Sequence, residues 1–283
     1  MKLVVMSAGK FTIKLIEKLH TFSEIELVGV IPDNSIDKEY LHEFRNKVEN
    51  LGVTLGDESL LRLADMVLVI EYRKLINESI VDKYNIINVH AGILPKYKGF
   101  SSNAFAIMNG EKQIGYSIHQ MDASMDGGDI YYVKQIDISE NETYCDVHDK
   151  LLDNMLATIP IVLIKIWKRQ ILPKPQVGKS VYGCKFKPEY GLLDFRKSTN
   201  WIYNLYRCMA KPLGTGVYFL YNNQRYDVGK MKKTNVVDDY LGIEGIIVNI
   251  VNGELWVKTQ DNIIILCDVL PKKNWKIGMH LGS

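Results

Sequence analysis

Residues 84–137 read YNIINVHAGILPKYKGFSSNAFAIMNGEKQIGYSIHQMDASMDGGDIYYVKQID, and the architecture of the whole chain follows from this segment. Residues 86–89 are mostly apolar and β-branched, which is typical of a buried strand. Asn88 and His90 lie two residues apart at the C-terminal end of this run, so a strand places them on one face. Open α/β sheets carry their chemistry at the C-terminal ends of strands. The run therefore predicts a polar site at Asn88 and His90.

A carboxylate follows in the same segment. Asp126 lies 36 residues after His90, in a glycine-rich turn. Two alternating runs, residues 115–121 and 130–138, flank this turn and predict strands. Strand ends and a tight turn can bring an amide, an imidazole and a carboxylate to one point, so we expect Asn88, His90 and Asp126 to converge.

The spacing of these residues resembles that of the folate-dependent formyltransferase superfamily. The matching positions are Asn-x-His, Leu-Pro-x-Tyr-x-Gly and the acidic turn, namely Asn88, His90, Leu94, Pro95, Tyr97, Gly99, Asp126 and Asp129. Combined motifs at set distances are more specific than either half alone. The resemblance implies that Asn88, His90 and Asp126 are catalytic and move a formyl group from N10-formyltetrahydrofolate to an amine. Many members carry a Ser where this chain has Gly92.

Each of these residues also has a plain structural interpretation. Asn88 can end a strand, His90 can be a buried, hydrogen-bonded histidine, and Asp126 can be an ordinary turn residue. A further histidine, His119, lies on the predicted strand 115–121. We interpret His119 as structural and leave it out of the catalytic set.

The resemblance also implies a folate-binding set. In formyltransferases a loop like residues 71–76 holds the pterin ring largely through main-chain groups. For Glu71 and Arg73 a solvated helix start is the alternative. Glycine in the acidic turn would let the main chain approach the pterin closely. The expected cofactor-binding residues are Tyr72, Arg73, Leu94, Asp122, Gly127, Gly128 and Asp129.

Composition sets limits on the class of protein. The 283 residues are 47% hydrophobic, enough for a sizeable core, and 35 basic against 33 acidic residues give a net charge of +2. This balance does not call for a nucleic acid or an anionic membrane as partner. The four cysteines are widely spaced, so we expect no zinc cluster, no disulfide framework and no metal site. No signal peptide is recognisable, and we expect a soluble, cytoplasmic protein.

The order of predicted elements indicates an α/β protein. Strands at 3–6, 25–31 and 66–70 alternate with helices at 11–19 and 38–50, which predicts a Rossmann-like, mostly parallel sheet flanked by helices. A long helical pattern covers residues 142–169 and contains Pro160, which we expect to kink or restart it. Residues 172–179 hold two prolines and read as linker.

Short alternating runs separated by Asn-Gly and Asp-Asn follow residue 243 and predict hairpins. They resemble the small OB-like antiparallel β barrel at the C-terminus of formyltransferases. We expect a catalytic domain at 1–173, a linker at 174–198 and a C-terminal domain at 199–283.

A substrate-binding set is expected outside the triad. The turn at Ser7 to Lys10 opens a helix, where free N–H groups attract anions, although a tight structural turn is the favoured alternative. Residues 182–195 resemble the segment that follows the catalytic domain in formyltransferases. Lys185 and Lys187 in this segment, and Arg207 beyond it, would meet a diphosphate, with a plain surface as the alternative. The full set is Ser7, Lys10, Tyr97, Lys98, Tyr182, Lys185 and Arg207.

The acceptor is inferred by comparison within the superfamily. Transfer-RNA formyltransferases carry a basic insertion after the second strand, whereas residues 31–52 are short and mixed in charge. We therefore expect the amino group of a nucleotide-linked amino sugar, as in sugar N-formyltransferases of lipopolysaccharide or O-antigen biosynthesis. The alternatives are a methionyl-tRNA formyltransferase, a formyltetrahydrofolate hydrolase and a non-catalytic folate binder. The resemblance also implies a homodimer.

Overall fold

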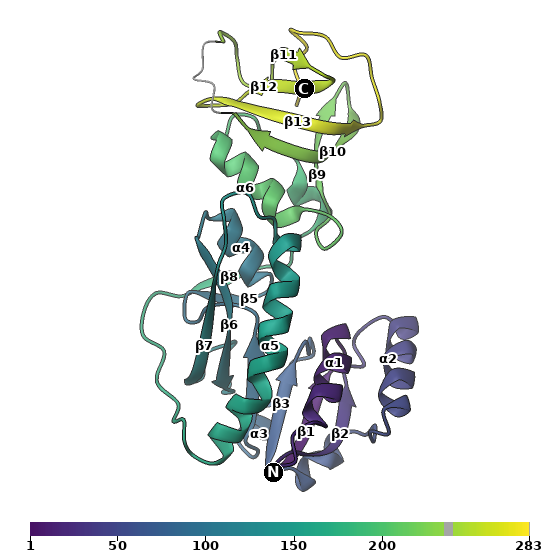
Figure 1. Ribbon diagram of the computed structural model, residues 1–283, viewed down its shortest axis with the longest axis vertical. Helices are drawn as coiled ribbons and strands as arrows, with labels where there is room; N and C mark the ends of the chain where they lie inside the picture. The colour runs from purple at the N-terminus through teal and green to yellow at the C-terminus, as the bar shows by residue number, and fades with distance from the viewer. Residues whose placement is uncertain (235–239, 283) are drawn as a thin grey trace. The chain divides into compact units, whose positions relative to one another are not determined.

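The computed structural model describes residues 1–234 and 240–282 (Figure 1). Contacts divide the chain into two compact units that alternate along the sequence. The first comprises residues 1–102, 115–136 and 149–183, and the second comprises residues 103–114, 137–148 and 184–283. The predicted ranges 1–173, 174–198 and 199–283 remain a prediction from the sequence, and residues 235–239 and 283 of the last range lie outside the described residues.

The larger sheet has the strand order β2-β1-β3-β4-β6-β7. Its members are β1 (Lys2–Ser7), β2 (Glu26–Pro32), β3 (Met66–Ile70), β4 (Ile86–His90), β6 (Gln113–Gln120) and β7 (Ile130–Asp137). The pairs β1–β2, β1–β3 and β3–β4 are parallel, and β4 pairs with β6 in the antiparallel sense. The predicted α/β class with a mostly parallel sheet is confirmed.

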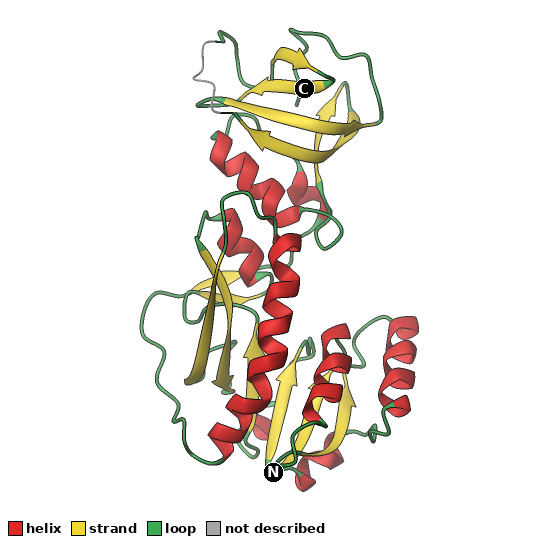
Figure 2. Ribbon diagram, in the orientation of Figure 1, coloured by secondary structure: helices red, strands yellow, loops and turns green. Residues whose placement is uncertain are grey.

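The central strands are nearly continuous runs of buried apolar residues, as expected where helices cover a parallel sheet. Helices α1 (Lys10–Leu19) and α2 (Lys38–Asn50) lie beside β1 and β2 (Figure 2). The Asp37 carboxylate caps α2 by accepting the N–H groups of Glu39 and Tyr40. Short helical turns, η1 (Glu58–Leu63) and α3 (Glu78–Val81), complete the connections around β3.

Two further helices follow β4. Helix α4 spans Ser102–Met108, and α5 (Tyr144–Trp167) contains Pro160 within one continuous helix. The predicted apolar stripe of α5 is buried at Val147, Leu151, Met155, Ile159, Val162, Leu163 and Ile166. The Tyr116 hydroxyl of β6 donates to the Asn154 carbonyl of α5, which ties this helix to the sheet.

The C-terminal part forms a five-stranded antiparallel sheet in the order β11-β12-β13-β10-β9, next to helix α6 (Thr199–Met209). Its strands are β9 (Val217–Tyr221), β10 (Gln224–Lys233), β11 (Ile247–Val251), β12 (Glu254–Lys258) and β13 (Ile263–Leu270). Asn252 and Gly253 both have positive φ, as a tight hairpin turn requires. The expected antiparallel β domain is confirmed, but the sequence prediction began only after β9 and β10.

A third, two-stranded sheet was not expected from the sequence. Strand β5 (Tyr97–Gly99) pairs in parallel with β8 (Val181–Gly183). Before β8, Lys174 exchanges two main-chain hydrogen bonds with Ile130 at the start of β7. After β8 comes one short turn, η2 (Pro188–Gly191). The segment that resembled a linker is therefore attached to the first unit at both of these places.

No helix in the described part of the chain is both long enough and apolar enough to span a bilayer.

The core of the larger sheet gives a direct stability test. Leu68 in β3 is 0% exposed, so Leu68→Ala leaves a cavity and should lower the free energy of unfolding by about 2–5 kcal/mol. Leu63 is 55% exposed, and Leu63→Ala should change it by less than about 0.5 kcal/mol. Urea unfolding of both variants checks this, and equal losses would contradict the position of β3 in the core.

Candidate active site

The structure brings Asn88, His90 and Asp126 together in the first unit. Asn88 and His90 end β4, and Asp126 lies in the turn between β6 and β7. His90 Nδ1 is 3.3 Å from Asp126 Oδ2, and Asn88 Nδ2 is 3.4 Å from Asp126 Oδ1. The carboxylate is thus the shared contact of the other two side chains.

Both ring nitrogens of His90 face oxygen acceptors. Besides the Asp126 contact, His90 Nε2 is 2.6 Å from the main-chain carbonyl of Tyr97, and the side chain is only 7% exposed. A neutral imidazole carries one N–H and satisfies one of these two oxygens. The 2.6 Å contact favours the N–H on Nε2, which leaves the Nδ1 lone pair directed at Asp126.

Burial controls the charge on this pair. It lowers the pKa of His90 below the ordinary histidine value, because it outweighs the upward effect of the Asp126 charge. Burial by itself would raise the pKa of Asp126, but its contacts with His119 and His90 and the hydrogen bond from the Gly99 N–H lower it. At neutral pH an ionised Asp126 therefore lies beside a neutral His90, and the pair can bind one more proton.

His119, which the sequence analysis interprets as structural, lies beside Asn88. It is 2% exposed, its Nδ1 is 2.8 Å from the Gln120 carbonyl, and its Nε2 is 3.0 Å from Asn88 Nδ2 and 3.7 Å from Asp126 Oδ1. The carbonyl contact places the N–H on Nδ1, so Nε2 accepts from Asn88. The signal that could have found His119 is register, because β6 places it directly opposite Asn88.

His119 and Asp126 together orient the Asn88 amide. Both are acceptors for the two N–H groups of Asn88 Nδ2. This leaves Asn88 Oδ1 as the amide atom for a ligand. An N–H of Asn88 could bind an oxyanion only if one of these two hydrogen bonds were exchanged.

The acidic turn is shaped by its own packing. Asp126 has a left-handed main chain with φ of 50°. A Cβ on Gly127 would lie 1.7 Å from Ser124 Oγ, and one on Gly128 would lie 1.9 Å from the Gln120 carbonyl. Internal contacts therefore account for both glycines without a ligand. Asp122 accepts the Ser124 N–H and hydroxyl, and the Asp129 carbonyl accepts the Gln120 N–H.

A buried carboxylate holds the loop that resembled a pterin site. Asp33, which is 0% exposed, accepts the main-chain N–H groups of Arg73 at 2.6 Å and Lys74 at 3.2 Å, and also bonds Ser35. Burial would raise the pKa of Asp33, but these hydrogen bonds lower it. Tyr72 packs against the apolar cluster under the sheet. The sequence analysis missed Asp33, for which a lone acidic residue after a strand gave no distinctive signal.

The loop after His90 is held by Ser117. Its hydroxyl accepts the Leu94 N–H at 3.0 Å and donates to the Gly92 carbonyl at 2.8 Å. A Cβ on Gly92 would lie 2.5 Å from His90 Nε2. Glycine at this position therefore makes room for the observed orientation of the imidazole.

The turn before α1 is occupied from within the protein. Ser7 is 0% exposed and its hydroxyl bonds that of Thr12. The Glu71 carboxylate accepts the N–H groups of Phe11 and Thr12, where an anion would bind the helix start. The substrate contact predicted at Ser7 finds no support here, and the structural alternative accounts for the turn. The Lys10 side chain is exposed.

Lys98 is a buried cation close to the triad. Its side chain is 8% exposed, and its positive charge contributes to the lowered pKa of His90. Its Nζ is 5.9 Å from the ring centroid of Tyr182, which is 63% exposed. Among the described residues no carboxylate forms an ion pair with it. Tyr97 is buried, and its carbonyl contributes to the site as described above.

The predicted cations Lys185, Lys187 and Arg207 lie in the second unit. Arg207 is 4% exposed and donates to the carbonyls of Glu142 and Ser139 and to the Asn204 side chain. These bonds account for Arg207 as a structural residue, so its predicted substrate contact finds no support. Lys185 is exposed and lies just after β8.

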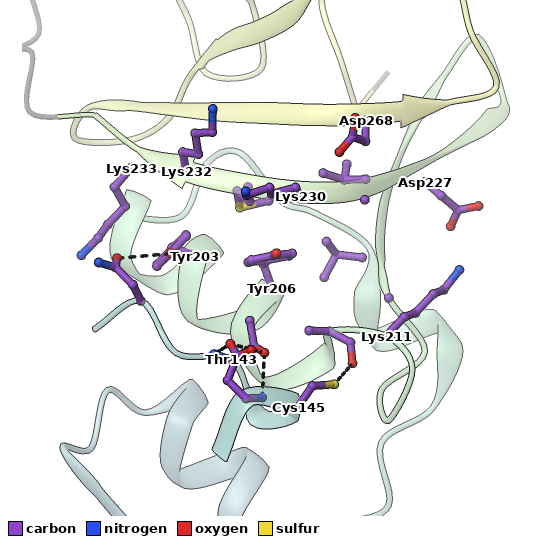
Figure 3. A pocket seen from close by; sticks show the side chains of 18 of the residues that line it. Thr143, Cys145, Tyr203, Tyr206, Lys211, Asp227, Lys230, Lys232, Lys233 and Asp268 are labelled. Carbon is purple, nitrogen blue, oxygen red and sulfur yellow. Dashed lines mark hydrogen bonds between the residues drawn. The ribbon is translucent and has the colours of Figure 1, made fainter. Parts of the chain in front are cut away.

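A separate hollow lies within the second unit. Its volume is about 1090 Å³, and Lys230, Lys232 and Tyr206 line it opposite Thr143 and Cys145 (Figure 3). Its charges are largely compensated within the protein, as in the ion pairs of Lys232 with Glu254 and Lys233 with Glu140. None of the predicted site residues is among its lining residues. Over residues 1–234 and 240–282, no group of three or more His, Cys, Asp or Glu side chains is placed to hold a metal ion.

Comparison with known proteins identifies two matching families. The sequence model described as "Formyl transferase" matches residues 3–163, and that described as "Formyl transferase, C-terminal domain" matches residues 185–279. A methionyl-tRNA formyltransferase from Fusobacterium nucleatum is 27% identical over 294 residues, which cover 96% of this chain and 93% of the relative. One from Francisella tularensis is 31% identical over 202 residues, 71% of this chain and 63% of the relative.

Solved structures share the fold. WlaRD, a sugar 3N-formyl transferase crystallised with dTDP and 5-N-formyl-THF, superposes with a TM-score of 0.72 at 17% identity, covering 96% of this chain and 99% of that one. An N-formyltransferase from Helicobacter canadensis, in complex with folinic acid and dTDP-3-aminofucose, gives a TM-score of 0.71 at 18% identity, with coverage of 94% and 98%.

The lowered pKa of His90 can be measured by NMR titration. The ring resonance of His90, identified by its loss in His90→Gln, should titrate below 6.5, the ordinary histidine value. Between the two pKa values, His90 binds a proton in the unfolded chain but not in the folded chain. The contribution of neutral His90 to the free energy of unfolding is therefore fully present above pH 6.5 and is lost as the pH falls toward the folded pKa. The His90→Gln variant should show a weaker pH dependence over that range. A titration midpoint above 6.5 would contradict the assignment.

Proposed function

Because the chain belongs to the formyl transferase family and transfers a formyl group from N10-formyltetrahydrofolate to an amine, we propose that its acceptor is the amino group of a nucleotide-linked amino sugar. The observation that supports catalysis at Asn88, His90 and Asp126 is the 3.3 Å contact between His90 Nδ1 and Asp126 Oδ2 inside a buried cluster. This contact places the Nδ1 lone pair of His90 beside a carboxylate, so the two groups can share one added proton.

The charge state of the pair matches the proton balance of the reaction. The amine nitrogen forms a bond to the formyl carbon and loses a proton, while the bond from that carbon to folate N10 breaks and N10 gains one. An ionised Asp126 beside a neutral His90 can accept the first proton as a unit. Transfer of this kind typically accelerates a reaction by about 10²–10⁴-fold.

The folate donor fits the loops on either side of the triad. Main-chain groups around Tyr72 and Arg73 would meet the pterin, since Asp33 already holds this loop in one conformation. Leu94 and the acidic turn at Asp122, Gly127, Gly128 and Asp129 would form the opposite side. In support, the fold-level neighbours named above were crystallised with 5-N-formyl-THF and folinic acid.

Two features favour a small phosphorylated acceptor. Only residues 33–37 connect β2 to α2, and they include Asp33 and Asp37, so this connection lacks the basic insertion of transfer-RNA formyltransferases. Without such a surface the electrostatic attraction that dominates nucleic-acid binding is weak. Lys98 under the exposed ring of Tyr182 offers a charge for a phosphate and a face for a planar ring.

A methionyl-tRNA acceptor is the second candidate. It is favoured by the relative from Fusobacterium nucleatum, which carries that name and matches 96% of this chain. The two acceptors differ in one measurable property. A transfer RNA would bind with an affinity that falls steeply as salt rises, because bound counterions are released from its phosphates.

The acceptor is tested by following consumption of N10-formyltetrahydrofolate. We expect rapid consumption with a nucleotide-linked amino sugar and little with methionyl-tRNA or with no amine. Consumption only with methionyl-tRNA, suppressed by salt, would establish the second candidate. Equal consumption without any amine would instead indicate a hydrolase, and none under any condition would indicate a folate-binding protein.

Removal of the proton-accepting pair should abolish turnover while the fold remains. His90→Asn and Asp126→Ala should each lower kcat by about 10²–10⁴-fold. Asp153→Ala is a matched control, because this aspartate lies exposed on α5, outside the predicted site residues. Thermal unfolding verifies folding, and near-normal kcat in either triad variant would remove the catalytic assignment.

His119 should act through the Asn88 amide. A glutamine side chain reaches the place of the imidazole Nε2 and can accept from Asn88, whereas asparagine reaches only the place of Nδ1. We therefore expect His119→Gln to retain most of kcat and His119→Asn to lose about 10-fold or more, the effect of one lost hydrogen bond at about 1.4 kcal/mol. Equal kcat in the two variants would show that the Asn88 contact is not needed.

A further inference from the structure

Gln176 lies outside every motif of the sequence and contacts the acidic turn directly. Its Nε2 is 2.8 Å from the carbonyl of Asp126 and 2.8 Å from the carbonyl of Gly128. Two carbonyl partners settle the orientation of the amide, since only the NH2 group can donate to both. One side chain thereby binds both ends of the three-residue turn that carries the catalytic carboxylate.

The turn needs such a partner because of its conformation. Asp126 has φ of 50°, a region that residues with a Cβ occupy at a cost in free energy. Such a conformation persists where the surroundings impose it, and the carbonyls of the turn need donors once they are buried. Gln176 supplies both donors from a distant part of the chain.

The position of Gln176 is itself well determined. On one side Lys174 exchanges main-chain hydrogen bonds of 2.8 and 2.9 Å with Ile130. On the other, Val181–Gly183 pairs with Tyr97–Gly99. The Gln176 side chain can therefore fix the turn at residues 126–128 relative to this segment.

The two polar atoms of the Gln176 amide differ in their hydrogen bonding. Its Oε1 is buried and has no hydrogen-bond partner within the described residues. A buried acceptor without a partner costs free energy, so packing alone would favour a different side chain. The NH2 group is the part that contributes.

We propose that Gln176 is a positioning residue for formyl transfer, which clamps the turn at Asp126 and Gly128 so that the Asp126 carboxylate stays against His90 Nδ1. The inference rests on the proposed function for its kinetic consequence. The clamp itself can be observed without turnover, through the titration of His90. Loss of the clamp moves the carboxylate away and removes its upward effect on the His90 pKa.

Two substitutions of similar size separate positioning from packing. Gln176→Met removes both donated hydrogen bonds without adding charge. Gln176→Glu removes them and directs a carboxylate at two carbonyls. Burial raises the pKa of a carboxyl group, so the glutamic acid side chain becomes a donor again as the pH falls. Gln170, an exposed residue after α5, gives the control Gln170→Glu.

We expect both Gln176 variants to lower kcat/KM at pH 8 by about 10–100-fold, the size of effect that a misplaced catalytic group produces. As the pH falls from 8 toward 6.5, a range above the titration of His90, the ratio of Gln176→Glu to wild-type activity should rise, whereas that of Gln176→Met should stay constant. In Gln176→Met the titration midpoint of His90 should move below the wild-type value. Gln170→Glu should match the wild type in each measurement.

Two results would overturn the inference. One is unchanged kcat/KM in Gln176→Met. The other is an activity loss in that variant with an unshifted His90 titration, which would mean a purely structural role. If Gln176→Glu does not fold, the methionine variant alone decides between these outcomes. If the wild type transfers no formyl group, the proposed function fails, while the His90 titration still tests the clamp.

Discussion

The contact between His90 and Asp126 depends on the main chain of one short strand. The carbonyl of Tyr97 takes one nitrogen of His90, and the N–H of Gly99 is 2.8 Å from the Asp126 carboxylate. Both groups belong to β5, whose register with β8 places them. The main chain of β5 thus aligns the side chains of His90 and Asp126, which belong to two other parts of the chain. The distance between them therefore depends on the position of β5.

Exclusion of water gives that contact its chemical character. A histidine beside a carboxylate in water would hold a second proton more tightly, but here burial has the larger effect and favours the neutral ring. The carboxylate remains ionised because several donors reach it. The same burial makes each unpaired polar atom costly, which explains why Asp33, Ser117 and His119 have nearly complete sets of partners.

The sequence predicted what depends on local pattern. Apolar β-branched runs predicted β1, β3 and β4, the periodicity of residues 38–50 predicted α2, and motif spacing predicted that Asn88, His90 and Asp126 lie together. It missed contacts between residues far apart in the chain. His119 lies opposite Asn88 through strand register, and Gln176 forms a hydrogen bond with Asp126, 50 positions earlier in the chain. The prolines around Gln176 indicated a linker. Local composition alone does not reveal the tertiary contacts that this segment makes.

The alternation of the two units along the chain limits how this protein can be divided. Strands β6 and β7 and helices α4 and α5 each carry residues of both units. A cut at residue 183 would leave the N-terminal fragment with two segments whose packing partners lie in the missing half. Exchange of the C-terminal half between homologous genes would have to preserve the fit of those two segments. Recombination at that point is therefore constrained, and the two halves are expected to have diverged together.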